Sequence, residues 1–226
     1  MRNMSTAIWK QWKDMIYNNN LELIKLNNHI SYITSTDVPL SANVVLVNGN
    51  DHVWMFDVGN HPDIPGIVNE FNRDGKKVNA VLSHFHPDHI GNIQKIKFDK
   101  VYQGRLTYKH TGLGDITESD IYIDDGDIRL HIFPLPSSHS KGSLAMEADE
   151  TYCFLGDGIY AMERLEEKVY NAGLLKEEIN VLNTVKADNF CLSHREPFIT
   201  PKEIVIRHLE KIYGRRSKNE AYIKDC

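Results

Sequence analysis

A nearly continuous apolar run over residues 78–82 leads directly into a polar segment that contains three histidines and an aspartate within six residues. The segment reads His84-Phe85-His86-Pro87-Asp88-His89. A strand that is apolar at successive positions is typical of a sheet covered on both faces, as in α/β proteins. Residues two apart in an extended chain face the same side, so His84 and His86 can converge on one cation. Asp88 and His89, beyond the bend that the proline favours, can face a second cation.

The residue types in this segment indicate a transition-metal site. Imidazole and carboxylate together suit zinc, iron or manganese, whereas magnesium and calcium prefer oxygen ligands only. The alternative is a solvated polar loop whose histidines are incidental. The density of donor side chains directly after a buried strand favours the metal site.

The first quarter of the chain is predicted to be largely antiparallel sheet. Apolar residues at helical spacing first predict a short amphipathic helix over residues 8–16. Alternating apolar and polar residues then predict two hairpins. Their strands are expected over residues 21–26 and 29–33, and over residues 43–47 and 52–56.

Helices and strands are both expected after residue 57. Apolar residues at helical spacing predict a helix over residues 64–71, with Gly75 as a natural stop. Two further hairpins are predicted by their strand patterns and by the acidic and glycine residues between the strands. Their strands are expected over residues 121–123 and 128–133, and over residues 143–148 and 152–155.

The last third is predicted to be mostly helical. Helical patterns run over residues 162–170 and 175–182, and a short strand is expected over residues 190–192. The final helix has clear start signals, with Thr200 as N-cap, Pro201 as the first helical residue and Glu203 at the third helical position. No repeat, linker or Pro/Ser-rich boundary divides the chain, so residues 1–226 are expected to form a single domain.

Composition and charge exclude several classes of partner. The net charge of −5 gives no basic patch for nucleic acid or an anionic membrane. The apolar runs are much shorter than the roughly 20 residues that a membrane helix requires. The first residues also lack the pattern of a secretory signal. We therefore expect a cytoplasmic protein that acts on a small molecule and has no nucleic-acid or membrane partner.

The cysteines do not indicate a disulfide framework or a thiolate zinc site. Cys153, Cys191 and Cys226 form an odd set without CxxC spacing. Cys153 and Cys191 lie in apolar, strand-like segments. We expect both to be inert buried thiols, since free cysteine usually packs as a small hydrophobic residue.

Five short motifs follow one another in the order found in a known family. They are Asp57-Val58-Gly59, the segment from His84 to His89, Ser138-His139-Ser140-Lys141-Gly142-Ser143, Phe154-Leu155-Gly156-Asp157 and Cys191-Leu192-Ser193-His194. From about residue 21 to the final helix, the chain resembles the metallo-β-lactamase fold superfamily, specifically its glyoxalase II-like and lactonase-like hydrolase branches. The resemblance implies an α/β fold in the form of an αββα four-layer sandwich, with two mixed sheets and outer helices.

The same resemblance implies a set of metal ligands. The first ion would take His84, His86 and His139, the second would take Asp88, His89 and His194, and Asp157 would be shared. Two divalent metal ions are expected, zinc in the first place, with iron or manganese as alternatives. Asp57 would support the site from behind the ligands, and its alternative role is to cap the helix that follows. Single histidines such as His139 or His194 also occur as ordinary surface or capping residues.

The resemblance further implies a hydrolytic reaction. A metal-bridging hydroxide would attack the carbonyl of a small ester, thioester or lactone, with Asp88 orienting the nucleophile. Tyr160, three residues after Asp157, is a candidate donor to the oxyanion or the leaving group, and its alternative role is packing. The 32 residues after His194 leave little room for the glutathione-binding helices of glyoxalase II. A lactamase role is not favoured because no export signal is visible.

Two other functions remain open at this point. The chain could resemble persulfide dioxygenases of the same fold, which would use a single iron held by His84, His139 and Asp157. It could also be a metal-binding protein without turnover. The flavodiiron branch is disfavoured, since His86 stands where those relatives have glutamate. The remaining histidines singled out are expected not to bind metal, namely His110 in an irregular stretch over residues 104–120, His131 in a strand and His208 in the final helix.

Overall fold

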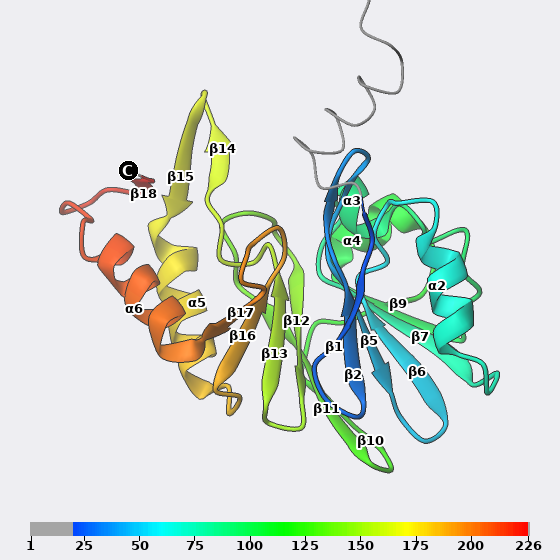
Figure 1. The fold of residues 1–226 in the computed structure, drawn as a ribbon. Helices are drawn as coiled ribbons and strands as arrows, with labels where there is room; N and C mark the ends of the chain where they lie inside the picture. Colours follow the sequence, from blue (N-terminus) through cyan, green and yellow to red (C-terminus); the bar gives the residue numbers. More distant parts are fainter. Residues whose placement is uncertain (1–19, 226) are drawn as a thin grey trace, which may run out of the picture.

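A computed structural model describes residues 20–225, so the helix predicted over residues 8–16 lies outside the described part of the chain. Two mixed sheets pack face to face and form the body of the molecule (Figure 1). In spatial order, the strands of the first sheet are β1 (Leu23–Lys25), β2 (Ile30–Ile33), β5 (Val44–Asn48), β6 (His52–Phe56), β7 (Lys77–Leu82), β8 (Lys100–Gln103) and β9 (Asp115–Ile116). Strands β1 to β6 pair antiparallel, and β6 to β9 pair parallel.

The second sheet is formed by the later part of the chain. Its strands, in spatial order, are β10 (Ile121–Asp125), β11 (Ile128–Leu135), β12 (Ser143–Ala148), β13 (Tyr152–Gly156), β16 (Asn189–Leu192) and β17 (Ile199–Pro201). Its only parallel pair within the described residues joins β13 to β16, so these two strands end at the same edge. That edge carries the loops that follow Gly156 and Leu192.

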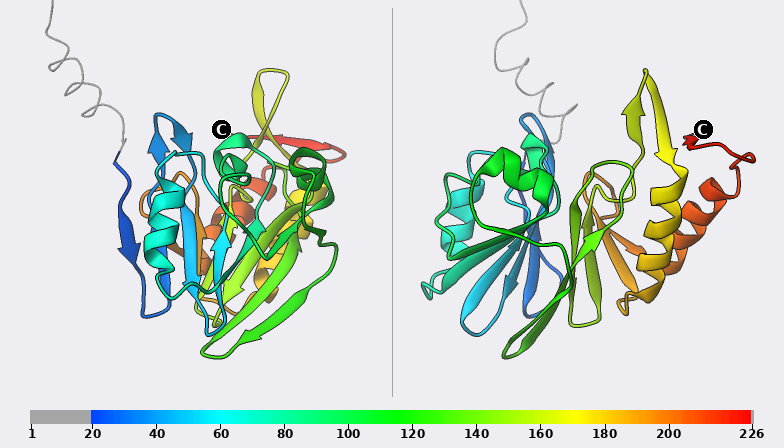
Figure 2. Two further views of the ribbon diagram at one scale, coloured as in Figure 1. Left: turned by 90° about the vertical axis from the view of Figure 1, so that its right-hand side faces the viewer. Right: turned by 180° about the vertical axis from the view of Figure 1, so that it is seen from behind.

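Helices complete the outer layers. Helix α2 (Ile64–Phe71) packs on the first sheet, while α3 (Pro87–Ile90) and α4 (Arg105–Thr111) follow the ends of β7 and β8. Helices α5 (Ala172–Thr184) and α6 (Lys202–Tyr213) cover the outer face of the second sheet, as the view from behind in Figure 2 shows. The four-layer α/β sandwich expected from the family resemblance is therefore confirmed.

Three apolar cores connect these layers. One lies between the two sheets and includes Val45 and Phe56 from the first sheet and Leu144 and Phe154 from the second. The other two lie between each sheet and its helices. Strands near the middle of a sheet are apolar on both faces and so serve two cores. In β5, Val45 and Val47 face the central core, and Val44 and Leu46 face the core beneath α2.

The hairpin predictions are confirmed, with strand ends shifted by at most a few residues. The first hairpin turns at Asn27, whose side-chain oxygen accepts hydrogen bonds from the amides of His29 (2.9 Å) and Ile30 (2.8 Å). The strand predicted over residues 78–82 corresponds to β7, and four consecutive residues at its end are buried. Cys153 and Cys191 are free and buried, as expected.

The helix predicted over residues 162–170 is wrong. This segment forms a hairpin of β14 (Met162–Arg164) and β15 (Glu167–Asn171), with Leu165 and Glu166 at positive φ in the turn. A third strand, β18 (Tyr222–Lys224), pairs antiparallel with β15 on the side away from β14. The apolar spacing that suggested a helix does not mark a buried face, because Leu165 is 82% exposed.

Two smaller predictions also need correction. Residues 104–120 are not irregular, because they contain α4 and β9. The final helix begins at Lys202, and its N-cap is Pro201 rather than Thr200. Thr200 belongs to β17 and pairs with Phe190, and a residue that precedes proline is disfavoured in the helical region. Within residues 20–225, no helix has the length and apolar character needed to cross a membrane.

Candidate metal centre

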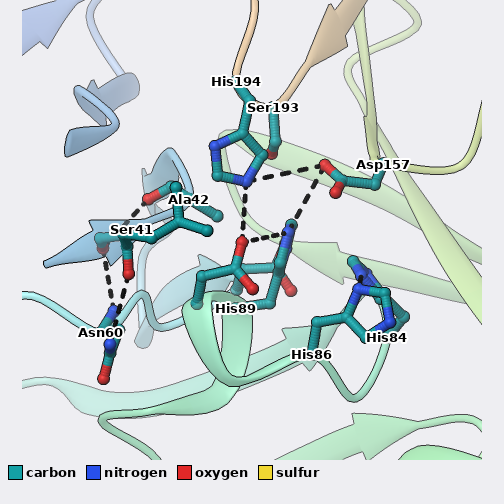
Figure 3. A network of polar contacts seen from close by, with 12 residues as sticks. Ser41, Ala42, Asn60, His84, His86, His89, Asp157, Ser193 and His194 are labelled. Atoms are coloured by element: carbon teal, nitrogen blue, oxygen red, sulfur yellow. Dashed lines mark hydrogen bonds and ion pairs between the residues drawn. The ribbon is translucent and has the colours of Figure 1, made fainter. Parts of the chain in front are cut away.

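Seven side chains predicted as ligands lie together where the two sheets meet at one edge. They form two groups, and the donor atoms of each group lie within 4.8 Å of one another. The first group is His84, His86, His139 and Asp157, and the second is Asp88, His89, His194 and the same Asp157. Figure 3 shows His89 and His194 directed toward Asp157, with His84 and His86 beside them.

The segment after β7 places four of these donors. The chain stays extended through His86 (φ −64°, ψ 143°), which orients His84 and His86 before the helix begins. Helix α3 then starts at Pro87, the residue type preferred at a first helical position. His84 and His86 therefore lie on extended chain, whereas Asp88 and His89 lie within the short helix α3.

Asp57 supports this segment from behind. Its side chain is fully buried, and it accepts hydrogen bonds from the Ser83 amide (2.7 Å), the Ser83 hydroxyl (2.8 Å) and His89 Nδ1 (2.7 Å). The bond to Nδ1 fixes the ring of His89 and leaves its Nε2 for the centre. Asp57 does not cap the following helix, since α2 begins at Ile64 with Asp63 as its N-cap.

The other three donors come from three separate loops of the second sheet. His139 lies between β11 and β12, Asp157 follows β13, and His194 follows β16. His139 Nδ1 donates to the carbonyl oxygen of Ala161 (3.4 Å), at the base of the hairpin of β14 and β15. At the other base of this hairpin, the Asn171 amide donates to the hydroxyl of Ser138 (2.9 Å).

The loop that carries His194 is held by two residues from elsewhere in the chain. The His194 amide donates to Asn43 Oδ1 (3.1 Å), and the Tyr160 hydroxyl donates to the carbonyl oxygen of Ser193 (2.6 Å). His194 itself has a positive φ of 58°. Asn43 could not be predicted from the sequence, because no local pattern around it points to a contact with residue 194.

The residues present fit metal ions, because polar atoms in this centre are buried without protein partners. Among the described residues, His89 Nε2 and Asp157 Oδ1 are buried and have no hydrogen-bond partner. They lie 3.5 Å apart, and His89 Nε2 is 3.4 Å from Asp88 Oδ2. Imidazole nitrogens also face one another, with His86 Nδ1 2.9 Å from His84 Nε2 and 3.1 Å from His139 Nε2. Nitrogen and carboxylate donors converging in this way are typical of zinc and related metals.

The electrostatics of the metal-free centre differ from one donor to the next. Burial and the neighbouring histidines hold the pKa of His84 well below its ordinary value, so this imidazole is neutral. Burial opposes a charge on His89, but the carboxylates of Asp57 and Asp157 outweigh it and raise its pKa to about 10. Burial alone would raise the pKa of Asp88. The hydrogen bond from His194 and the charge of His89 outweigh burial, so the pKa of Asp88 is lowered. Metal binding to such a site would release the proton of His89.

The histidines expected not to bind metal lie outside both groups. His110 lies on α4 and stacks on Phe85, with ring centroids 4.4 Å apart. His131 contacts Asp120 (2.9 Å) and Glu147 (3.4 Å). His208 is exposed on α6.

Part of the chain is similar to known proteins. Residues 37–123 match the family model described as the metallo-beta-lactamase superfamily, and this stretch includes the segment from His84 to His89. A hydroxyacylglutathione hydrolase from Rhodopseudomonas palustris (strain ATCC BAA-98 / CGA009) is 29% identical over 68 residues. That alignment covers 30% of this chain and 26% of the length of the relative.

Solved structures share the fold over most of this chain. A metallo-beta-lactamase from Pontibacter korlensis matches with a TM-score of 0.63 and 16% identity, over 87% of this chain and 100% of the other. The rubredoxin oxygen:oxidoreductase from Desulfovibrio gigas matches with a TM-score of 0.67 and 13% identity, over 88% of this chain and 63% of the other. The chain thus shares its fold with metallo-beta-lactamases and carries a His/Asp cluster suited to metal. Over a shorter stretch, its sequence is weakly similar to a hydroxyacylglutathione hydrolase.

Proposed function

We propose that this protein is a dinuclear metal-dependent hydrolase that cleaves a small ester, thioester or lactone. The observation that carries the proposal is the geometry of Asp157, which belongs to both donor groups. A carboxylate shared in this way can bridge two ions, one held with His84, His86 and His139 and the other with Asp88, His89 and His194. Zinc suits this donor set, and iron or manganese would also be accepted.

The chemistry supplied by the bound ions is Lewis acidity together with a lowering of the pKa of water to about 7. The protein contributes orientation and charge. Before metal binds, His194 Nε2 lies 2.9 Å from Asp88 Oδ2 and lowers the pKa of Asp88, which favours its carboxylate form. An ionised Asp88 at this position can orient the attacking water and accept its proton.

Tyr160 stays a prediction as a donor to the oxyanion or leaving group. Its ring lies near His139, with centroids 6.3 Å apart, but its hydroxyl donates to Ser193. Burial and the charge of Asp157 raise the pKa of Tyr160 to about 12, so the hydroxyl keeps its proton at neutral pH. To act on a substrate, the hydroxyl would have to leave its bond to Ser193.

Similarity to the hydroxyacylglutathione hydrolase supports a thioester among the candidate substrates. The similar region covers only 26% of that enzyme, so most of its chain has no counterpart in the alignment. We therefore propose the carbonyl chemistry and leave the acyl and leaving groups to a screen of substrates.

Elemental analysis of protein purified without added metal, combined with assays of thioesters, lactones and phosphodiesters, tests this proposal. We expect close to two metal ions per chain and carbonyl hydrolysis that stops on chelation. One iron per chain, with oxygen consumed in the presence of a persulfide, would instead identify an oxygenase that uses His84, His139 and Asp157. If no substrate is hydrolysed at full metal loading, the protein is a metal-binding protein without turnover.

A further inference from the structure

One peptide group beside the metal centre is held from both sides by distant residues. The peptide bond that joins Ser193 to His194 accepts a hydrogen bond at its carbonyl oxygen from Tyr160 (2.6 Å), and its amide donates to Asn43 Oδ1 (3.1 Å). The amide of Ser193 is also bound, to the carbonyl oxygen of Gly156 (3.1 Å). Every polar atom of the peptide that leads into His194 thus has a specific partner.

The two contacts come from different sheets. Asn43 stands directly before β5 in the first sheet, 151 residues from His194 in sequence. Tyr160 follows β13 in the second sheet, close after Asp157. The hydrogen bonds therefore tie the loop of His194 across the junction of the two sheets. Asn43 is 1% exposed and Ser193 is 3% exposed, so water does not compete freely for these bonds.

The backbone of His194 needs such restraint. Its φ of 58° lies in the left-handed region, which costs free energy for a residue other than glycine and persists where surrounding contacts enforce it. The conformation matters for the centre, because it directs His194 Nε2 to within 2.9 Å of Asp88 Oδ2 and 3.9 Å of Asp157 Oδ1.

We propose that Asn43 and Tyr160 are positioning residues that hold the peptide between Ser193 and His194 and so aim His194 into the second donor group. This inference rests on the proposed function, since it assigns both residues a role in binding the second metal ion. In this proposal, the Tyr160 hydroxyl holds the backbone at Ser193 and does not contact substrate. It also explains a buried asparagine at the start of β5.

Loss of either contact leaves a buried polar group of the peptide unpaired and frees the backbone of His194. The imidazole would then leave its position beside Asp88. Residues that orient a metal ligand typically change metal affinity by about 10–100-fold when they are replaced. We expect a loss of that size for the second ion and little change for the ion held by His84, His86 and His139.

The test uses Asn43→Ala and Tyr160→Phe in the full chain, with Tyr170→Phe as the matched control. Tyr170 is also buried, and its hydroxyl donates to a backbone carbonyl, that of Ile159 (3.3 Å), rather than to the peptide between Ser193 and His194. Hydrogen exchange is first measured on the metal-free proteins, in a peptide that contains residue 194. Zinc titration with a competing chelator then gives the affinity of each equivalent.

We expect faster exchange at residue 194 in Asn43→Ala and Tyr160→Phe, and a second zinc equivalent weakened by about 10–100-fold. Tyr170→Phe should match the unsubstituted protein in both measurements. Asn43→Asp keeps an acceptor for the amide and should restore its protection. This rescue separates the loss of one hydrogen bond from a general loss of packing.

The proposal is overturned if exchange at residue 194 is unchanged in both variants. It is also overturned if both zinc equivalents weaken equally, or if Tyr170→Phe has the same effect. Should the unsubstituted protein bind only one equivalent, the dinuclear function fails, yet the exchange measurement still decides whether the peptide is held as proposed. The two failures are therefore distinguishable.

Discussion

The two halves of the metal centre are built in different ways. Four donors come from a single stretch, the segment from His84 to His89, at the end of one strand and the start of one short helix. The other three, His139, Asp157 and His194, come from three loops that follow different strands of the second sheet. The first half is thus local in sequence, whereas the second exists only when the second sheet has formed.

The supports of the two halves differ in the same way. Asp57 and Ser83 form a compact side-chain network that holds His89 from within the first sheet. His139 is instead held by a contact with Ala161 in another loop, and the loop of His194 is held by Asn43 from the other sheet, 151 residues away in sequence. Disturbance of remote loops should therefore affect the second half of the centre while the first half keeps its geometry.

The largest effect is expected from Asp157→Ala, because this residue belongs to both donor groups. Its Oδ1 has no hydrogen-bond partner among the described residues, so its loss should leave the sheets intact. We expect metal content to fall at both positions and hydrolysis to fall by more than ~100-fold, beyond the range typical of residues that only orient ligands. Elemental analysis, circular dichroism and turnover measure these three properties.

Asp188→Ala is the control for that variant, since Asp188 is an exposed aspartate near β16 and outside both donor groups. It should keep its metal and its activity. Retention of both ions and full turnover by Asp157→Ala would refute the shared role of this carboxylate, and the two donor groups would then be separate sites.

The next effect tests the support of the first half. Asp57→Asn keeps the size of the side chain, and asparagine tolerates the φ of 59° at position 57. The substitution weakens the hydrogen-bond acceptor for His89 Nδ1. We expect about 10–100-fold weaker binding at the position that contains His89. Competitive metal titration measures it, with Asp63→Asn, whose side chain is 77% exposed, as the control.

Hydrogen exchange at residue 194 should stay the same in metal-free Asp57→Asn. The reason is that Asp57 contacts Ser83 and His89, and neither residue holds the loop of His194. Increased exchange at that position would show that the two halves share one network, which contradicts the difference in their construction.

The same difference explains what could be predicted from sequence. The donors from His84 to His89 follow directly from residue type and spacing, and the hairpins from alternation. The hairpin of β14 and β15 was missed because its outer edge is completed by β18, in which Tyr222 and Ile223 pair with Asn171 and Tyr170 from much earlier in the chain. No pattern within residues 162–170 indicates that this segment pairs with β18.

The positioning residues were missed for a related reason. Asn43 meets His194 across 151 residues of sequence, and an asparagine before a strand is equally compatible with an ordinary turn. His139, Asp157 and His194 could be found only through the family resemblance, because each stands alone in its loop. Spacing along the chain carries information about neighbours on one element, and it carries none about residues that meet only after the sheets pack.

A smaller effect concerns buried carboxyl groups in the two halves of the molecule. Asp57 has three hydrogen-bond donors, whereas neither carboxyl oxygen of the fully buried Glu178 on α5 has a partner among the described residues. Burial raises the pKa of Glu178 well above its ordinary value of 4.5. Because the pKa is raised on folding, this group favours the folded state fully below pH 4.5, and that stability is lost as the pH rises toward the folded pKa.

Glu178→Gln should remove this loss, which is about 1.4 kcal/mol for each pH unit above the unfolded pKa until the folded pKa is reached. Urea unfolding of the metal-free protein at a series of pH values from roughly 5 to 8 measures the slope. Glu177→Gln, at the exposed neighbouring position, should keep the slope of the unsubstituted protein. Equal slopes in all three proteins would mean that Glu178 finds a partner in solution.

The smallest effect is expected from His208→Ala. This variant tests whether a histidine must lie in a loop after a strand, as His139 and His194 do, to bind metal. His208 is exposed on α6, and burial together with the charge of Arg195 lowers its pKa. An exposed helical residue outside any donor group should change the free energy of unfolding by no more than about 0.5 kcal/mol. Metal content should be unchanged, whereas His139→Ala should lose the ion of the first group. Loss of metal from His208→Ala would show that α6 takes part in the centre, and the second half would then depend on a helix as well as on the three loops.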